Sequence, residues 1–420
     1  MLVLIRQAKI VDPRSDFHDK TVDLLIENGK IKSIGSSLKD KADKVIEAEG
    51  LLVSPGWVDV LADYREPGYE QKETINTGLN AAAAGGFTDV LLAPNTNPVV
   101  STKSIVEFVA SRAAKHAVSL HPLGAATQDI EGKTLSEMLD MRSTGAVAFT
   151  DGWKPIQNAN LMLKALEYIK AFDGVLLQVP VEISLSAGGL MHEGPISTRL
   201  GMAGIPEMAE TLMVHRDIEL LRYTNSRLHI TGVSSATSVE MIRKAKAEGL
   251  NITCSVTPYH LALNDEALTT YSSMYKVSPP LRSEADRKAL VAGLKDGTID
   301  CVATHHRPQE WDAKTKEFEY AADGMNIQEW AFNIIWKAAG IEVGLDRLIE
   351  ALSIAPAKIF GLERTPVAEG ATATFTLFTL NGTQATDKMK SASRNNPFIG
   401  AELPCKVIGI VNRNNHSLNS

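Results

Sequence analysis

Four side chains of the types that bind metal ions or transfer protons follow apolar runs of this chain: Asp63, Asp151, His305 and His306. Two histidines and two carboxylates could form a metal site or an acid–base pair. His305 and His306 are adjacent, however, and successive residues of a strand point to opposite faces. If the strand continues through them, only one of the two histidines can face the other groups.

Asp63 lies in a stretch around which the rest of the chain is organised, residues 55–68, which runs P-G-W-V-D-V-L-A-D-Y-R-E-P-G. Residues 57–61 have the composition of a short buried strand, and proline and glycine interrupt the chain on both sides of it. A strand that gives way abruptly to a polar loop is typical of a barrel strand that delivers side chains to an active-site mouth.

Eight short apolar runs begin with this strand and alternate with helix-like segments. The runs are residues 57–61, 87–93, 117–124, 145–150, 174–180, 227–233, 251–256 and 299–304. The helical segments are residues 74–84, 103–115, 134–142, 160–172, 205–225, 238–248 and 287–294, followed by 325–339 and 345–353. This alternation indicates parallel βαβ units, and eight units predict an α/β fold with a (β/α)8 TIM-like barrel over residues 54–364. An open doubly wound sheet is less favoured, because no G-x-G-x-x-G follows the first strand.

The two ends of the chain have a different pattern from the barrel region. Residues 1–53 alternate short β-like runs with turns and contain no helical stripe, which predicts a small all-β unit. Residues 365–420 become β-like again, at 373–380 and 405–412.

Composition excludes several classes of protein. The 420 residues are 44% hydrophobic and 22% charged, which is ordinary for a globular protein. The net charge of −7 without a basic stripe argues against nucleic acid as a partner. No apolar run reaches 18 residues, so we expect neither a membrane span nor a signal peptide, and a cytoplasmic location. The three cysteines are far apart and lack C-x-x-C spacing, which indicates reduced core thiols: Cys254, Cys301 and Cys405.

Residues 55–68 resemble the opening signature of the dihydroorotase branch of the amidohydrolase superfamily, P-G-x-x-D-x-H-x-H-x-R-x-P-G. Similar family landmarks recur along nearly the whole chain, at residues 94–98, 149–152, 192–194, 205–210, 256–261, 279–282, 296–304, 356–362 and 396–400. The resemblance implies a small β-sandwich built from segments 1–53 and 365–420 beside the barrel. It also implies the family's reaction, the reversible hydrolysis of the cyclic amide dihydroorotate at a zinc centre.

The chain departs from the family where the family has its zinc-binding histidines. The two histidines of the first strand correspond to Leu61 and Asp63, and that of the sixth strand corresponds to Gly232. The fifth-strand histidine corresponds to Val179, or to Gln178 if the count slips by one residue. Neutral imidazoles are the usual zinc ligands, and none of these five side chains is an imidazole.

The family's general base is also changed. In the motif T-D-H-A-P-H the aspartate corresponds to His305, and the final, substrate-contacting histidine corresponds to Gln309. Asp151 alone keeps a ligand-type side chain. One carboxylate without imidazole partners is a poor transition-metal site, so we expect no cofactor in this chain.

The substrate-binding positions resemble the family more closely. Arg65 matches the arginine that grips the substrate carboxylate, a task that suits a guanidinium fork, and Asn97 matches a second contact. A third family asparagine is Ser278 here. We therefore expect the chain to retain a pocket for a small anionic ligand.

The lead hypothesis is a catalytically silent dihydroorotase homologue. The chain resembles bacterial dihydroorotase-like proteins that lack the metal ligands and hold aspartate carbamoyltransferase in an assembly, which implies that enzyme as a partner. Family resemblance also implies a homodimer. One alternative is an active dihydroorotase or cyclic-amide hydrolase with a rebuilt site, and another is a small-molecule sensor that uses Arg65 and Asn97.

Overall fold

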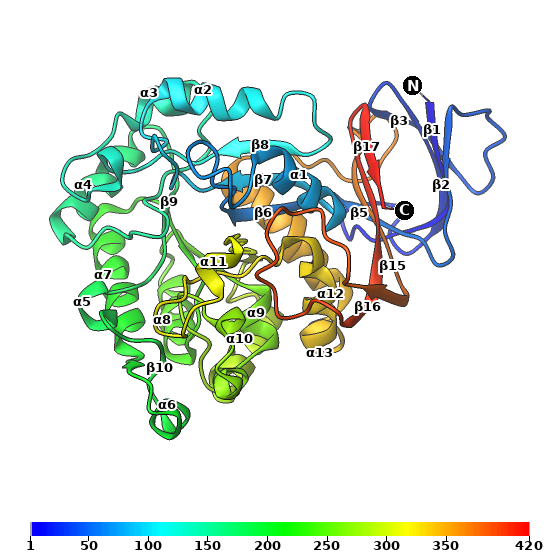
Figure 1. Cartoon of the computed structure of the whole chain (residues 1–420). Helices are drawn as coiled ribbons and strands as arrows, with labels where there is room; N and C mark the ends of the chain where they lie inside the picture. The colour runs from blue at the N-terminus through cyan, green and yellow to red at the C-terminus, as the bar shows by residue number, and fades with distance from the viewer. Residues whose placement is uncertain (1, 420) are drawn as a thin grey trace.

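The computed structural model describes residues 2–419 and shows two units, a barrel of strands and helices and a strand-rich sheet from both chain ends (Figure 1). The barrel fills most of the molecule, and the two chain ends lie together on one side of it. Within the described residues, no helix combines the length and the apolar character needed to cross a membrane.

The barrel strands are all parallel: β6 (Trp57–Ala62), β7 (Phe87–Leu92), β8 (Ser119–Pro122), β9 (Leu176–Gln178), β12 (Leu228–Thr231), β13 (Ile252–Val256) and β14 (Cys301–Val302). Between β8 and β9, Phe149 forms parallel bridges to Gly124 and to Leu176, which take the place of a fourth strand. A parallel bridge from Ala62 to His306 closes the ring. The predicted (β/α)8 barrel is confirmed, although residues 145–150 contribute only bridges.

Helices on the outside of the barrel overlap the predicted segments: α1 (Ile75–Ala84), α2 (Lys103–Arg112), α3 (Met138–Ser143), α4 (Ala159–Lys170), α7 (Met208–Thr224), α8 (Ala236–Ala247), α10 (Glu284–Asp296), α12 (Ala331–Ile335) and α14 (Leu345–Ile349). Two short helices, α13 (Ile341–Val343) and α15 (Ala355–Phe360), lie outside the predicted segments. Local signals set their ends. The Thr74 and Ser283 side chains accept hydrogen bonds from the first turns of α1 and α10, and Gly297, with φ of 82°, ends α10.

Short elements in the connecting loops had no counterpart in the predicted pattern. They are α5 (Ile183–Ser186), α6 (Pro195–Leu200), α9 (Pro258–Ala262) and α11 (Trp311–Lys314), together with a two-stranded parallel pair, β10 (Met191–His192) and β11 (Gly204–Ile205). The loops that carry them extend the barrel on the side where the strands end.

The second unit is one mixed sheet in the strand order β17-β16-β15-β5-β1-β2-β3, with β4 beside β1. Its N-terminal strands are β1 (Leu2–Ile10), β2 (Thr21–Glu27), β3 (Lys30–Gly35), β4 (Lys44–Ile46) and β5 (Leu52–Pro55), and its C-terminal strands are β15 (Thr374–Ala385), β16 (Glu402–Asn412) and β17 (Asn415–Leu418). Antiparallel pairing of β15 with β5 joins the two ends of the chain. This unit has an apolar core of its own, as the predicted sandwich requires.

The loop of residues 386–401, which joins β15 to β16, leaves the sheet and packs against the barrel (Figure 1). The Asn395 side chain donates to the Arg307 carbonyl at 3.0 Å and accepts from the Gln309 amide at 3.0 Å. The Ala392 amide donates to the Glu73 carboxylate at 3.0 Å. The loop is therefore fastened to segments that follow β6 and β14, at the mouth of the barrel.

Candidate functional site

The candidate site lies where the carboxyl ends of the barrel strands meet, the position at which barrel enzymes carry their chemistry. Asp63 follows β6, Gly232 follows β12 and His305 follows β14. The structure thus brings the sequence-predicted positions to one end of the barrel. The side chains there determine what that end can do.

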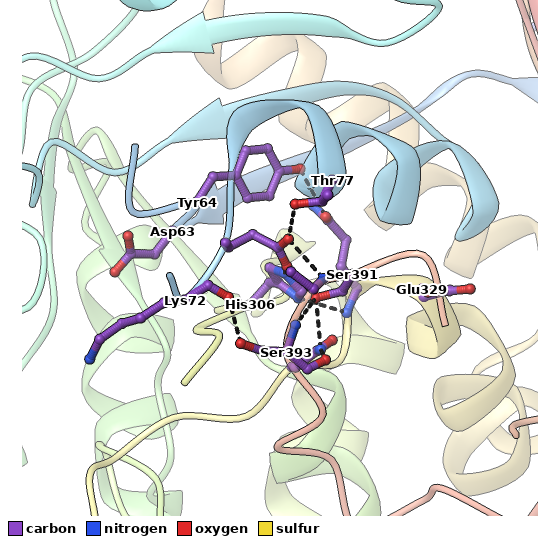
Figure 2. Close-up of polar contacts among 12 residues, drawn as sticks. Asp63, Tyr64, Lys72, Thr77, His306, Glu329, Ser391 and Ser393 are labelled. Carbon is purple, nitrogen blue, oxygen red and sulfur yellow. Dashed lines mark hydrogen bonds and ion pairs between the residues drawn. The ribbon is translucent and has the colours of Figure 1, made fainter. Parts of the chain in front are cut away.

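Asp63 is fully buried, and its carboxylate is engaged by protein donors. Its Oδ2 accepts a hydrogen bond from Trp153 Nε1 at 2.7 Å, and its Oδ1 accepts one from the Arg65 amide at 3.2 Å. The Arg65 Nε lies 3.1 Å from Oδ2, which makes an ion pair. Figure 2 shows the carboxylate pointing away from His306. Asp63 therefore holds an indole and a guanidinium in place.

Leu61 and Val179 line the inside of the barrel with aliphatic side chains. Both are buried, at 0% and 3% exposure, in one apolar cluster that fills the barrel interior. Gln178, the alternative to Val179, turns away and donates from Nε2 to the Ile156 carbonyl at 3.2 Å. The inward-facing position just after β9 is thus that of Val179, and neither Leu61 nor Val179 offers a metal a lone pair.

The ring of His305 fills the space into which a side chain at position 232 would extend. Gly232 has φ of 76°, and a Cβ added to it would lie 2.4 Å from His305 Cε1. The His305 Nε2 lies 2.8 Å from Thr231 Oγ1, and the ring packs edge-on against Trp153 with centroids 5.2 Å apart. The imidazole of His305 therefore lies where a side chain at position 232 would begin.

His305 is uncharged near neutral pH. Burial, reinforced by the positive fields of His260, His229 and Arg307, lowers the pKa of His305 to about 3. Its Nδ1 is buried and has no hydrogen-bond partner within residues 2–419. A neutral imidazole with so low a pKa is a weak acceptor of protons at pH 7.

His306 contacts other groups than His305 does, as the alternation of strand residues predicts. Its Nε2 lies 3.6 Å from Glu73 Oε2, its Nδ1 accepts from the Gln328 amide at 3.3 Å, and its ring packs against Tyr64. The hypothesis that both histidines join Asp63 and Asp151 in one new site is therefore wrong, because His305 and His306 diverge.

Asp151 is buried, and its carboxylate is hydrogen-bonded to Thr127 and not to any group that contacts Asp63. Its Oδ1 accepts from the Thr127 amide at 2.9 Å, and its Oδ2 accepts from Thr127 Oγ1 at 2.5 Å. Burial raises the pKa of Asp151 to about 6, despite these hydrogen bonds. Asp151, the position that keeps a ligand-type side chain, thus holds the loop that contains Thr127.

The residues at the positions where the family resemblance implies zinc ligands do not fit zinc. Three of them, Leu61, Val179 and Gly232, have no donor atom, and the carboxylates that remain are hydrogen-bonded to the protein. Across residues 2–419, no three side chains of histidine, cysteine, aspartate or glutamate are grouped so as to hold a metal ion. A tetrahedral zinc site needs three or four such donors at one point.

The positions expected to bind substrate differ in exposure and in the groups they contact. The Arg65 side chain is 11% exposed and lies at the mouth beside Asp63. Asn97 is exposed at the surface, and its backbone amide donates to the Pro67 carbonyl at 2.9 Å. Gln309 is buried and spans from Lys72 Nζ, at 2.7 Å, to the Asp323 carbonyl, also at 2.7 Å.

Sequence reasoning missed two residues of the site, Trp153 and Arg307. The Trp153 indole contacts Asp63 and His305, and the Arg307 Cζ lies 4.9 Å from the centre of its ring. A signal for Arg307 was present, because it stands where the motif T-D-H-A-P-H has alanine. Trp153 follows Asp151-Gly152, in the motif that has one acid fewer than the family pattern.

Comparisons with known proteins agree with the resemblance. A family model described as "Dihydro-orotase-like" matches residues 50–238. A protein of Syntrophus aciditrophicus named "Dihydroorotase" is 40% identical over 416 residues, 97% of each chain. Another so named, from Pelotomaculum thermopropionicum, is 42% identical over 408 residues, 96% of this chain and 95% of its own.

Solved structures show the same fold at lower identity. An L-hydantoinase (dihydropyrimidinase) from Arthrobacter aurescens has a TM-score of 0.85 at 21% identity, covering 100% of this chain and 97% of its own. A D-hydantoinase has a TM-score of 0.84 at 22% identity, covering 100% and 95%. With full-length relatives at about 40% identity, motifs in the same order and a barrel with a two-ended sheet, the chain belongs to the dihydroorotase family.

Proposed function

We propose that this chain is a catalytically silent member of the dihydroorotase family. The observation that carries the proposal is the packing of His305 over Gly232, in the space from which the family's sixth-strand histidine would extend. In this contact, Gly232 stands at the position of a family ligand and His305 at the position of the family's aspartate base. The His305 ring also fills the space between them. The aliphatic Leu61 and Val179 support the same reading from the first and fifth strands.

The chemistry of cyclic-amide hydrolysis supports the proposal. The reaction requires an activated water and a base that accepts its proton near neutral pH. His305 stands in the base position with a pKa of about 3, set chiefly by its burial, and so has little driving force to accept that proton. Asp63 is occupied by Trp153 and Arg65.

We further propose that the chain acts as a scaffold or regulator of aspartate carbamoyltransferase, as a homo-oligomer. The support is the contrast between an intact barrel, with its family landmarks and two-ended sheet, and a dismantled centre. A fold kept whole without its ligand set is what a structural role would require. The resemblance to ligand-less bacterial homologues names the partner.

A second candidate is an active dihydroorotase or other cyclic-amide hydrolase with a rebuilt site. The names of the relatives favour it, since proteins 40% and 42% identical along nearly the whole chain are called dihydroorotases. Such a site would have to draw on Asp63, Asp151 and His305, after release of the hydrogen bonds that now hold them.

One sample separates the two candidates. The full chain is purified without chelator, its metal content is measured by elemental mass spectrometry, and dihydroorotate turnover is assayed in both directions. We expect no stoichiometric zinc and no turnover. About one bound metal per chain together with hydrolysis would overturn the proposal and establish the second candidate.

The partner is tested by isolating the chain under native conditions from the cells that make it. We expect aspartate carbamoyltransferase to co-purify in fixed stoichiometry, and its activity to change when the chain is removed. Isolation of the chain alone, at several salt concentrations, would refute the scaffold role but leave catalytic silence to the metal and turnover assay.

A further inference from the structure

Five side chains on and beside β12 and β13 form a hydrogen-bond relay: Thr253, His229, Ser255, Thr231 and His305. Thr253 Oγ1 lies 2.9 Å from His229 Nδ1, and His229 Nε2 lies 3.1 Å from Ser255 Oγ. Ser255 Oγ lies 2.9 Å from Thr231 Oγ1, which lies 2.8 Å from His305 Nε2. The strand register pairs His229 with Thr253 and Thr231 with Ser255. Residues two apart on a strand share a face, so the register brings the two imidazoles into contact through three hydroxyls.

The direction of these hydrogen bonds follows from one donor. Ser255 Oγ donates to Thr231 Oγ1, and a hydroxyl has only one proton to give. The contact between Ser255 and His229 must therefore take its proton from His229 Nε2. Within residues 2–419, the Thr231 hydroxyl has no acceptor other than His305 Nε2. The proton of Thr231 is thus directed at that nitrogen.

Both imidazoles of the relay are neutral at pH 7. Burial lowers the pKa of His229 to about 3, and it does the same for His305. A neutral imidazole carries one ring proton, so a nitrogen that accepts leaves that proton on the other nitrogen. His229 carries its proton on Nε2, and its Nδ1 accepts from Thr253. His305 accepts at Nε2, so its own proton lies on Nδ1.

His305 ends the relay with a proton that no protein group receives. Its Nδ1 is buried and has no hydrogen-bond partner within residues 2–419. An N–H left without an acceptor in a buried place is unfavourable, so the ring gains nothing at Nδ1 from this tautomer. The hydrogen bonds behind Nε2 are therefore what holds the proton on Nδ1.

We propose that the relay from Thr253 to Thr231 positions His305 in its Nδ1–H tautomer. In that state neither ring nitrogen has a free lone pair, because Nε2 accepts from Thr231 and Nδ1 carries the proton. The imidazole at the position of the family's aspartate base can then neither take up a proton nor bind a metal unless the relay reverses. Reversal requires every hydrogen bond of the relay to exchange donor and acceptor together, since each hydroxyl has one proton.

This inference rests on the proposed catalytic silence for its consequence, since a base without a lone pair explains why position 305 does not act. Its test is separate, because it locates protons on two rings and measures neither metal content nor turnover. A chain that turned over dihydroorotate with His305 protonated on Nδ1 would refute the silence alone. A silent chain with the proton of His305 on Nε2 would refute the tautomer alone.

The test is a two-bond ¹H–¹⁵N correlation spectrum of the full chain at pH 7, with ¹⁵N in the histidine rings. Such a spectrum separates ring nitrogens that carry a proton from those that carry a lone pair. The signals are assigned by their loss in His305→Gln and His229→Gln. We expect Nδ1 of His305 and Nε2 of His229 to carry the protons. A proton on Nε2 of His305, or a charged His305 ring, would overturn the proposal.

Variants of the hydroxyl groups test whether the tautomer is set through the relay. Ser255→Ala removes the middle of the relay at a residue that does not hydrogen-bond to His305. We expect the two nitrogen signals of His305 to shift towards each other, because Thr231 is then free to accept as well as to donate. Thr231→Val, which removes the hydroxyl, should cause a similar shift. Thr231→Ser, which keeps the hydroxyl, should retain the parent pattern.

The matched control is Ser226→Ala, at a buried serine outside the relay whose hydroxyl donates to the Leu166 carbonyl at 2.5 Å. It should leave the ring signals of His305 where they are in the parent chain. Melting curves show which variants fold. A folded Ser255→Ala chain with unchanged His305 signals would refute the relay, and the parent spectrum decides the tautomer if a variant does not fold.

Discussion

At the residue scale, the ring of His305 fills the space next to Gly232. The glycine has a left-handed backbone, and the imidazole above it is held by Thr231 and Trp153. A buried ring held on two sides cannot move aside cheaply to admit another side chain. Substitutions at positions 232 and 305 should therefore have non-additive effects on the free energy of unfolding.

Replacement of Gly232 by alanine should destabilise the chain more than the same change at Gly249. Both glycines have positive φ, at 76° and 84°, but a Cβ at 249 meets open space, whereas one at 232 meets His305 Cε1 at 2.4 Å. The backbone cost, about 1 kcal/mol, is common to both, so overpacking at 232 should add about 1–3 kcal/mol. Urea unfolding of both variants measures the difference.

A His305→Ser background gives the complementary result. Removal of the ring opens the space, so Gly232→Ala should then cost no more than Gly249→Ala. An equal penalty at 232 with and without the ring would show that the two positions are not coupled.

Replacement of His305 by glutamine should make the chain less sensitive to acid. Burial lowers the folded-state pKa of His305 to about 3, whereas the unfolded value is about 6.5. As pH falls through this window the unfolded chain takes up a proton that the folded chain refuses, so the parent loses up to about 1.4 kcal/mol per pH unit through this group.

The measurement is the free energy of unfolding of parent and variant at pH 7, 6 and 5. The stability of His305→Gln relative to the parent should rise as pH falls, because glutamine takes up no proton in the unfolded chain. The control is His215→Gln, at an exposed histidine of α7. A difference between parent and His305→Gln that does not change with pH would mean that the His305 ring is solvated.

At this scale the sequence predicts identities better than contacts. The patterns at residues 55–68, 232–235 and 304–309 predict that Leu61, Gly232 and His305 stand where the family has its ligands and its base. They do not show that the His305 ring fills the space over Gly232, because that depends on rotamers set by Thr231 and Trp153.

At the scale of elements, the loop of residues 386–401 connects the sheet unit to the barrel mouth. Asn395 both donates to the Arg307 carbonyl and accepts from the Gln309 amide, so one side chain satisfies two backbone groups of the segment after β14. The loop therefore positions the backbone that presents His305 and Arg307.

Replacement of Asn395 by alanine should loosen this segment. Loss of hydrogen bonds to buried backbone groups should cost about 1–3 kcal/mol and raise amide hydrogen exchange across residues 305–310 and 386–401. Hydrogen-exchange mass spectrometry measures the change. The control is Asn251→Ala, at an exposed asparagine before β13, and faster exchange confined to other parts of the chain would contradict the role assigned to Asn395.

Elements with strong periodicity were predictable, and those set by tertiary pairing were not. The helix predicted over 74–84 is observed as α1, with Thr74 as its cap, because capping and an apolar face act locally. Residues 145–150 have strand composition but form only bridges at Phe149. Strand length there depends on the neighbours, which local pattern does not contain.

At the scale of the whole molecule, a buried ion pair lies where the barrel segment ends and the chain leads into the C-terminal strands of the sheet unit. Arg364 contacts the Asp89 carboxylate on β7 and donates from Nε to the Gly56 carbonyl at 3.2 Å. Burial alone would raise the pKa of Asp89, but Arg364, with His121 at 2.8 Å, holds it at about 2. Asp89 and Arg364 are 275 positions apart, so only the folded topology brings them together, and the sequence could not have predicted the pair.

Replacement of Arg364 by methionine should cost about 3–5 kcal/mol, because Asp89 is left buried and charged. The control is Arg222→Met, whose side chain is 40% exposed, and which should cost far less stability although its ion pairs are as short. Thermal unfolding measures both. Equal losses of stability in Arg364→Met and Arg222→Met would show that the Arg364–Asp89 pair is solvated. A separate early unfolding transition in Arg364→Met would show that the pair couples the barrel to the sheet unit.

The contact between positions 232 and 305 also bears on how this chain could change over generations. A histidine introduced at 232 would meet the imidazole of 305, and an aspartate introduced at 305 would abandon Thr231 and leave a void above the glycine. Each single step towards the family's ligand set would thus lower stability before any ligand could act. A change at either position alone is therefore costly, and we expect viable sequences to change positions 232 and 305 together.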